Sequence, residues 1–209
     1  MKTRMGMTDR EPSRSNPAKP SRGRLVVWAV VLLLVGMAAP RLAKENLLSE
    51  GGAVEESQAL PEFPQSSGLD DSRWIGTEPL TVEAMRGRVW VLKVWTFGCI
   101  NCVRSIPYAN DLTTRFGDDV GVLGIHSPEF DWERDPEALA AALVEHDVRF
   151  PSYVDQGLEY FFALDTPAWP TFYVVDRGGN IRGRWVGEVH EGTLRAKAFE
   201  GLIRELVEE

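Results

Sequence analysis

The sequence predicts an α/β fold in which a mixed central β-sheet is flanked by helices. Two observations carry this prediction. First, two nearly continuous apolar runs, "RVWVLKVWT" (88–96) and "VGVLGIH" (120–126), are each followed by a segment with helical character. Second, a hairpin pattern near the C-terminus leads into an amphipathic helix. The resulting order of strand, helix, strand, helix, hairpin and helix is typical of a layered domain with helices on both faces of the sheet.

The run 88–96 is rich in β-branched and aromatic residues, as expected for a central strand buried on both faces. The segment 100–116 follows as a predicted helix that ends at Gly117. Pro107 lies inside this segment, so a kink is expected there.

The run 120–126 predicts a second buried strand. A helix is then expected with Asp135 as N-cap and Pro136 at its first position. The segments 171–176 and 181–187, joined by "RGGN", predict a hairpin.

The last predicted helix covers 193–208. A helical period places five apolar residues on one face. They are Leu194, Ala198, Leu202, Ile203 and Leu206.

The N-terminal part has a different composition. Residues 1–24 are rich in Pro, Ser, Lys and Arg and predict a basic disordered tail. Residues 25–40, "LVVWAVVLLLVGMAAP", carry no charge, and a basic flank before such a run is typical of a membrane-targeting segment whose basic side stays in the cytoplasm. Residues 41–69 are acidic with Gly, Ser and Pro and are interpreted as a flexible linker, which leaves 70–209 as the folded domain.

Sixteen apolar residues suit either a short membrane span or the core of a cleaved signal. The long basic tail and the lack of a clean A-x-A site favour an uncleaved single-pass anchor, with secretion after cleavage as the alternative. Either arrangement places the domain outside the cytoplasmic membrane. Of the net charge of −8, residues 1–40 carry seven basic and two acidic residues, so residues 41–209 carry −13, which argues against general nucleic-acid binding.

The only two cysteines, Cys99 and Cys102, stand three positions apart between the predicted strand 88–96 and the helix after it. Structural zinc needs about four ligands, and the three histidines lack the matching spacing, so no metal site is predicted. A permanent disulfide across so short a loop would add little stability. A dithiol that cycles with a disulfide fits better, because a thiolate at a helix N-terminus is stabilised and a second cysteine one turn later is within reach.

The segment "VWTFGCINCVRSIPY" resembles the active-site segment of thioredoxin-like proteins, specifically the exported TlpA/ResA-like group, and it is most similar to the thioredoxin-like domain of DipZ proteins. "GVLGIHSPEFDWERD" and "TPAWPTFYVVDRGGNIRGRW" are similar to two further segments of that group. The resemblance covers roughly residues 70–209. It implies a thioredoxin-like fold, with Cys99 as the attacking and Cys102 as the resolving cysteine.

The same resemblance implies that Pro170, after Trp169, is the cis-proline that faces the cysteines and contacts the partner chain. Trp95, Phe97 and Trp169 are expected to flank the disulfide with apolar surface, although Trp95 is equally explained as core. Asn101, between the cysteines, is a candidate for tuning the redox poise.

One position departs from the resemblance. Many thioredoxins carry a buried acid six residues before the first cysteine, and this chain has Lys93 there. A neutral amine could accept a proton and an ammonium could stabilise a Cys102 thiolate, while snorkelling or pairing with an acidic residue such as Glu129 explains the residue equally well. His126 and Glu129 follow a central strand, where such sheets place their sites, and are further tuning candidates with a plain loop role as the alternative.

The sequence therefore predicts a membrane-anchored, extracytoplasmic thiol:disulfide oxidoreductase that uses no cofactor. The resemblance implies reduction of exported proteins, with apocytochrome c thiols as one candidate, and a membrane electron donor of DsbD/CcdA type. Two alternatives stay open. One is a thiol peroxidase, because Thr96 and Cys99 have the T-x-x-C spacing, although Leu92 replaces the proline of that motif. The other is a Cu(I)-binding module of Cys99, Cys102 and His126, since soft thiolates suit that ion.

Overall fold

The computed structural model describes residues 51–64 and 73–209. These residues lie in one compact unit, Glu45–Glu209, built around a single seven-stranded sheet. The strands are β1 (Gly52–Ala59), β2 (Trp74–Ile75), β3 (Val89–Trp95), β4 (Val120–His126), β5 (Ser152–Val154), β6 (Thr171–Val175) and β7 (Asn180–Val186). The α-helices are α2 (Val82–Met85), α3 (Ile100–Arg104), α4 (Ile106–Phe116), α5 (Pro136–Glu145), α6 (Glu159–Ala163) and α7 (Leu194–Glu208), with 3₁₀ turns at Gly117–Asp119 and Asp131–Arg134.

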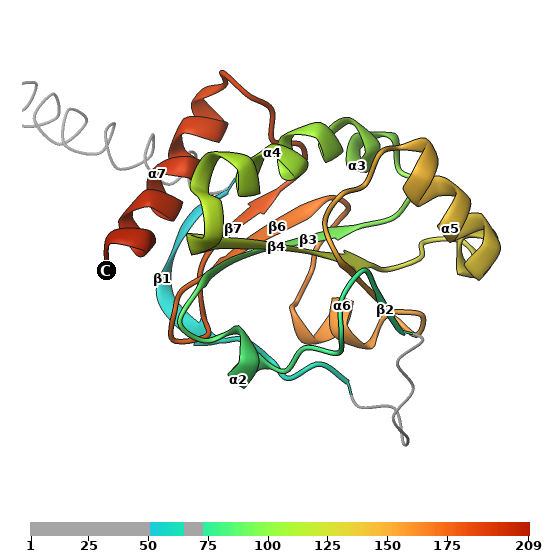
Figure 1. The fold of residues 1–209 in the computed structure, drawn as a ribbon, viewed down its shortest axis with the longest axis horizontal. Coiled ribbons are helices and arrows are strands. Elements are labelled where there is room, and N and C mark those ends of the chain that lie inside the picture. The colour runs from blue at the N-terminus through green and yellow to red at the C-terminus, as the bar shows by residue number, and fades with distance from the viewer. Residues whose placement is uncertain (1–50, 65–72) are drawn as a thin grey trace, which may run out of the picture. The chain divides into compact units, whose positions relative to one another are not determined.

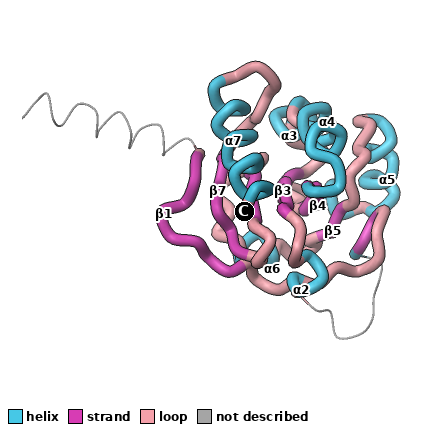
Figure 2. The backbone as a smooth tube through the Cα atoms, turned by 60° about the vertical axis from the view of Figure 1, so that its left-hand side comes forward, coloured by secondary structure: helices cyan, strands magenta, loops and turns pink. Residues whose placement is uncertain are grey.

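The sheet is mixed, with the strand order β1-β7-β6-β3-β4-β5-β2. β3, β4 and β5 are parallel neighbours, whereas β6 and β7 form an antiparallel hairpin beside β3. Figure 2 shows β1 and β7 on one side of the domain and β5 on the other. The central strand β3 is therefore hydrogen-bonded on both sides, which fixes the position of the chain where it leaves the sheet at Trp95.

Helices α3, α4 and α7 lie along one face of the sheet, and α2 and α6 lie on the other (Figure 1). The side chains of β3 alternate between these two faces, as a strand requires. Val89, Val91 and Trp95 belong to the hydrophobic core under α3, α4 and α7, while Trp90, Leu92 and Val94 belong to the core on the other face. This explains why every residue of β3 is buried.

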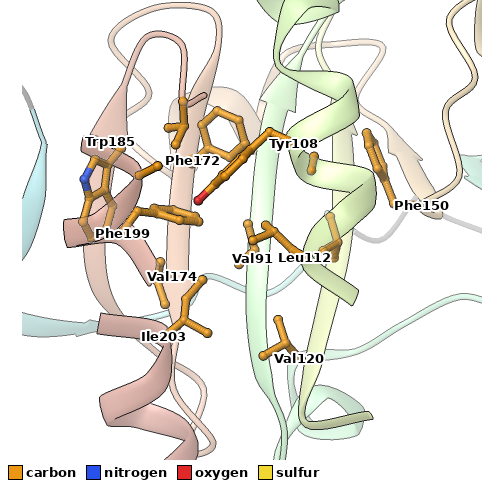
Figure 3. Close-up of a cluster of buried hydrophobic side chains, with 14 of the residues drawn as sticks. Val91, Tyr108, Leu112, Val120, Phe150, Phe172, Val174, Trp185, Phe199 and Ile203 are labelled. Atoms are coloured by element: carbon orange, nitrogen blue, oxygen red, sulfur yellow. The ribbon is translucent and has the colours of Figure 1, made fainter. Parts of the chain in front are cut away.

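The first of these cores is drawn in Figure 3, where side chains of the sheet meet those of α4 and α7. Phe199 of α7 packs edge-on against Trp185 of β7 and Phe172 of β6, with ring centroids 4.9 and 5.8 Å apart. Tyr108 of α4 lies 6.1 Å from Phe199 by the same measure. A continuous set of aromatic contacts thus joins α4 and α7 to the sheet.

The predicted helix 100–116 is wrong as a single element, because the chain forms α3 and α4 with a break at Ser105. Pro107 has no backbone N–H, so the carbonyl of Val103, four residues earlier, cannot receive its usual helical bond. The N–H of Ser105 donates to the carbonyls of Cys102 and Val103 instead. The predicted kink at Pro107 is therefore realised as a change of helix.

The last helix is confirmed with Thr193 as N-cap, whose hydroxyl oxygen accepts from the N–H of Ala196. The predicted apolar face is wrong at two residues, because Leu194 is 83% exposed and Ala198 is also exposed. Ala196 and Phe199 take their places beside Leu202, Ile203 and Leu206.

The segment interpreted as a flexible linker contains structure. Residues 52–59 form β1, which pairs antiparallel with β7, and Leu60 and Phe63 after it are buried. Phe63 stacks on Tyr160 at 4.5 Å and meets Trp74 edge-on at 5.0 Å. The folded unit therefore begins before residue 70.

The predicted membrane segment 25–40 and the basic tail 1–24 lie outside the described residues. Within residues 51–64 and 73–209, no helix has both the length and the apolar character needed to cross a membrane.

Candidate active site

The two cysteines lie where β3 leaves the sheet and α3 begins. Cys99 is the N-cap of α3 and is partly exposed, whereas Cys102 is one turn further on and fully buried. Both are free thiols. The strand-to-helix placement expected from the sequence is confirmed, and it gives the two sulfurs different surroundings.

The surroundings of Cys99 favour its thiolate. The backbone N–H of Cys102 donates to Cys99 Sγ at 3.3 Å. The pKa of Cys99 is lowered to about 6, first by a hydrogen bond from the Cys102 side chain, then by the backbone N–H groups of Cys102 and Asn101, and last by the charge of Lys93. At neutral pH this sulfur is a nucleophile that solvent and a partner chain can reach.

The surroundings of Cys102 favour its thiol. Burial raises the pKa of Cys102 far above its ordinary value, and the hydrogen bond to Cys99 raises it further. Since the sulfur is covered by the core, it is protected from direct attack by solutes. The pair thus holds one reactive thiolate and one protected thiol that donates a hydrogen bond to it.

The peptide bond between Trp169 and Pro170 is cis, as the resemblance implied. The carbonyl oxygen of Trp169 lies 3.8 Å from Cys99 Sγ, so this turn faces the reactive cysteine. The Trp169 indole is fixed by its N–H bond to the carbonyl of Ser127 (3.0 Å) and by stacking on Phe161 at 4.5 Å. Pro170 and Trp169 therefore belong to the site geometrically.

Lys93 is fully buried, and its Nζ donates to the backbone carbonyl of Cys102 at 3.0 Å. Burial lowers the pKa of Lys93 to about 8. The two alternatives to a role at the site, snorkelling and pairing with Glu129, are both wrong, because the side chain does not reach the surface and Glu129 is exposed. The amine is directed toward the cysteine pair.

Aromatic rings extend from the site toward the surface. Phe97 stacks on His126 at 5.5 Å and meets Trp132 edge-on at 5.2 Å. Trp132 and Phe130 stack on each other and are 55% and 50% exposed, so they offer apolar surface beside Cys99. Trp95 is completely buried and belongs to the core, which decides between its two interpretations.

His126 is buried at the end of β4, and neither ring nitrogen has a hydrogen-bond partner among the described residues. Burial lowers its pKa to about 4, so the imidazole is neutral at physiological pH. It packs edge-on against Trp95 at 5.6 Å. Asn101 is exposed on α3, and it contributes its backbone N–H to the Cys99 thiolate.

Glu133 is a site residue that sequence reasoning missed. It is buried, and its carboxylate accepts from the N–H of Gly98 at 3.0 Å and from those of Glu129 and Phe130 at 2.6 and 2.8 Å. It therefore ties the loop before Cys99 to the loop after β4. A Cβ at Gly98 would lie 2.2 Å from the Glu133 carboxylate oxygen, which explains the glycine before the reactive cysteine.

A partly exposed thiolate, a protected thiol and an adjacent backbone turn are the parts needed for thiol–disulfide exchange. The described residues contain no group of three or more His, Cys, Asp or Glu side chains arranged to hold a metal ion.

No protein-family profile matches the chain. SUPPRESSOR OF QUENCHING 1 of Arabidopsis thaliana is 34% identical over 142 residues, which cover 67% of this chain and 13% of that protein. DipZ of Mycobacterium tuberculosis is 27% identical over 161 residues, 75% of this chain and 23% of that one. Thiol-disulfide oxidoreductase YkuV of Bacillus subtilis is 24% identical over 120 residues, covering 57% of this chain and 80% of YkuV.

Two solved structures are similar to this one. A thioredoxin-like superfamily protein, SPOA0173, is 28% identical with a TM-score of 0.62, covering 73% of this chain and 97% of that one. A thiol-disulfide isomerase of Corynebacterium glutamicum is also 28% identical, with a TM-score of 0.59 and coverage of 72% and 97%.

The fold and the site together define a thioredoxin-like protein of the thiol-disulfide oxidoreductase class. The chain is homologous to DipZ, as the resemblance of the active-site segment indicated. The chain spans less than a quarter of the length of SUPPRESSOR OF QUENCHING 1 and of DipZ, so the match concerns one domain of those proteins.

The Cys99 pKa provides a test of this geometry. Replacing Cys102 by Ala removes the side-chain hydrogen bond that lowers the pKa most, so the midpoint of Cys99 alkylation by iodoacetamide should rise by about one unit or more above 6. The matched variant Cys102→Ser replaces the thiol donor by a hydroxyl donor and should raise the alkylation midpoint less. Each variant has a single thiol, so the alkylation rate as a function of pH reports Cys99 alone. Equal midpoints in the two variants would contradict the assigned cause.

Proposed function

We propose that the chain is a membrane-anchored, extracytoplasmic thiol:disulfide oxidoreductase that reduces disulfides of exported proteins. The observation that carries this proposal is the asymmetry of the pair, in which a partly exposed thiolate at Cys99 is backed by a buried thiol at Cys102. The relative YkuV, named as a thiol-disulfide oxidoreductase, supports the same chemistry.

The reaction proceeds in two exchanges. The Cys99 thiolate attacks one sulfur of the substrate disulfide, which releases one substrate thiolate and leaves a mixed disulfide on Cys99. Cys102, deprotonated, then attacks Cys99 Sγ, which forms the Cys99–Cys102 disulfide and releases the second substrate thiolate. Two electrons have moved from the protein dithiol to the substrate.

The turn at Trp169 and Pro170 provides the place where the substrate chain lies during the first exchange. Its carbonyl lies 3.8 Å from the attacking sulfur, and Phe97, Trp132 and Phe130 provide apolar surface on another side. An extended substrate segment with apolar residues near its cysteine fits this arrangement. Apocytochrome c is one candidate substrate.

The protein disulfide must be reduced again for a second turnover. We assign this step to a membrane electron donor of DsbD/CcdA type, because a domain outside the cytoplasm has no access to cytoplasmic reductants. Residues 25–40 anchor the chain, residues 1–24 stay in the cytoplasm, and the domain faces the other side.

The activity is tested with the reduced full-length protein in detergent and a fluorescent peptide that contains one disulfide. Cys102→Ser should accumulate a covalent adduct on Cys99, whereas the unmodified protein should release the peptide thiols and show little adduct. Cys99→Ser is the matched control and should form no adduct. The proposal fails if Cys102→Ser forms no adduct. Hydrogen peroxide consumption that needs Cys99 but not Cys102 would support the peroxidase instead.

The orientation is tested by labelling spheroplasts with a membrane-impermeant maleimide after reduction. Cys99, as the partly exposed thiol, should be labelled in intact spheroplasts. In a Cys99→Ser/Cys102→Ser background, Ser15→Cys in the tail should be labelled only after lysis. Labelling of Cys99 only after lysis would place the domain in the cytoplasm and contradict the proposal.

A further inference from the structure

Lys93 is a buried titratable residue beside the cysteine pair that the two exchanges above do not use. It lies on β3 between Val91 and Trp95, so strand alternation directs its side chain into the core under α3. None of its side-chain surface is exposed. A lysine at such a place needs a physical reason, because burying an ammonium is costly.

The hydrogen-bond partner of the Lys93 amine is Cys102. The backbone carbonyl of Cys102 accepts its hydrogen bond at 3.0 Å. Nζ lies over the rings of Trp95 and Phe172, at 5.3 and 5.6 Å from their centroids. No carboxylate among the described residues pairs with this amine. The ionisable groups that raise its pKa when they are deprotonated are Cys102 and Cys99.

The remaining elements around Lys93 contribute no charge. β4 presents Gly124 opposite Lys93 and the neutral imidazole of His126 beyond Trp95, and β6 presents Phe172. The protonation of the amine therefore depends on burial and on the two sulfurs, and on little else.

Hydrogen bonding at this position suits a neutral amine. An ammonium has three N–H donors, but the described residues offer it a single acceptor, the carbonyl of Cys102. The two ring faces favour a cation, whereas burial disfavours one. A neutral amine keeps the bond to the carbonyl and has a lone pair free to accept a proton. Burial accordingly lowers the pKa of Lys93 to about 8, near the pH at which a proton acceptor works best.

Whether Cys99 is a thiolate or part of a mixed disulfide changes the pKa of Lys93 during the reaction. A Cys99 thiolate raises the pKa of Lys93. Once Cys99 is part of a mixed disulfide, that negative charge is gone, and the amine loses its proton more readily. The neutral form is thus favoured at the step in which the thiol of Cys102 must lose a proton.

We propose that the Lys93 amine accepts the proton of the Cys102 thiol as Cys102 resolves the mixed disulfide. This inference rests on the proposed function. The S–H bond of Cys102 breaks as an N–H bond forms on Lys93, and the resulting thiolate attacks Cys99 Sγ. The Cys99–Cys102 bond forms, the bond from Cys99 to the substrate sulfur breaks, and the substrate leaves as a thiolate. Electrons flow only between sulfurs, and Lys93 handles only the proton.

The test follows decay of the mixed disulfide in a single turnover, using the full-length protein in detergent and the fluorescent disulfide peptide, with acid quenching between pH 6 and 10. Lys93→Met keeps the length and removes the basic group. It should slow the decay about 100-fold at pH 7, in the range of general base catalysis. The decay in the unmodified protein should rise with pH and level off at or below about pH 8, because the mixed disulfide lacks the Cys99 charge that raises the Lys93 pKa. Lys93→Met should lose this inflection.

Two matched variants separate proton transfer from charge. Lys93→Glu supplies a different proton acceptor and should restore the decay to within about tenfold of the unmodified protein. Lys93→Arg keeps a positive charge but cannot release its proton, so it should be as slow as Lys93→Met. Formation of the adduct in the Cys102→Ser background should change less than about threefold with Lys93→Met, because the charge of Lys93 lowers the Cys99 pKa less than the hydrogen bonds from residues 101 and 102 do.

Decay in Lys93→Met within threefold of the unmodified protein would overturn the proposal. So would rapid decay in Lys93→Arg, since charge alone would then suffice. If circular dichroism shows that Lys93→Arg is unfolded, the pH profile decides, and an unmodified protein without an inflection at or below about pH 8 contradicts the proposal. Failure of adduct formation in Cys102→Ser would instead refute the proposed function, so the two failures are distinguishable.

Discussion

The hydrogen bonds from Cys102 to Cys99 Sγ are the interaction on which the site depends. These hydrogen bonds lower the pKa of Cys99, while burial raises the pKa of Cys102, so two chemically identical side chains become a thiolate and a thiol. This difference in burial depends on the position of the junction between β3 and α3. β3 holds that junction in place, because it is hydrogen-bonded to β4 and β6 on its two sides and is covered on both faces.

Hydrogen bonds hold the loops around this junction in place. The Glu133 carboxylate accepts from the N–H of Gly98 in the loop before Cys99 and from two N–H groups of its own loop after β4, so separating the two loops would break a hydrogen bond to a buried carboxylate. The Trp169 indole fixes the turn that carries Pro170 to Ser127, just after β4. The reactive sulfur is therefore placed by the ends of three neighbouring strands, β3, β4 and β6. This is the edge of the sheet where α/β folds usually build their sites.

The sequence predicted the parts of the fold that local patterns encode. β3 and β4 are continuous apolar runs, and their positions and the cysteine pair between strand and helix were predicted directly. β1 was missed because it is an edge strand whose partner, β7, lies more than 100 residues away, and its acidic composition resembles a linker. Glu133 was missed for a similar reason: its partner Gly98 is 35 residues away, and no local pattern marks a buried carboxylate. Lys93 was identified as unusual from its place in an apolar strand, but only the packing of α3 over β3 shows that its amine meets the carbonyl of Cys102.

The central claim is that Cys99 and Cys102 form a reversible dithiol/disulfide couple with reducing character, and its most direct test is the reduction potential of the full-length protein in a graded thiol buffer. Thioredoxin and DsbA, with reactive thiol pKa values of about 7 and 3.5, have potentials of about −270 and −120 mV. A Cys99 pKa of about 6 predicts one reversible transition between about −270 and −200 mV. A potential near about −120 mV would contradict the reducing direction, and the absence of any reversible disulfide would contradict the account as a whole.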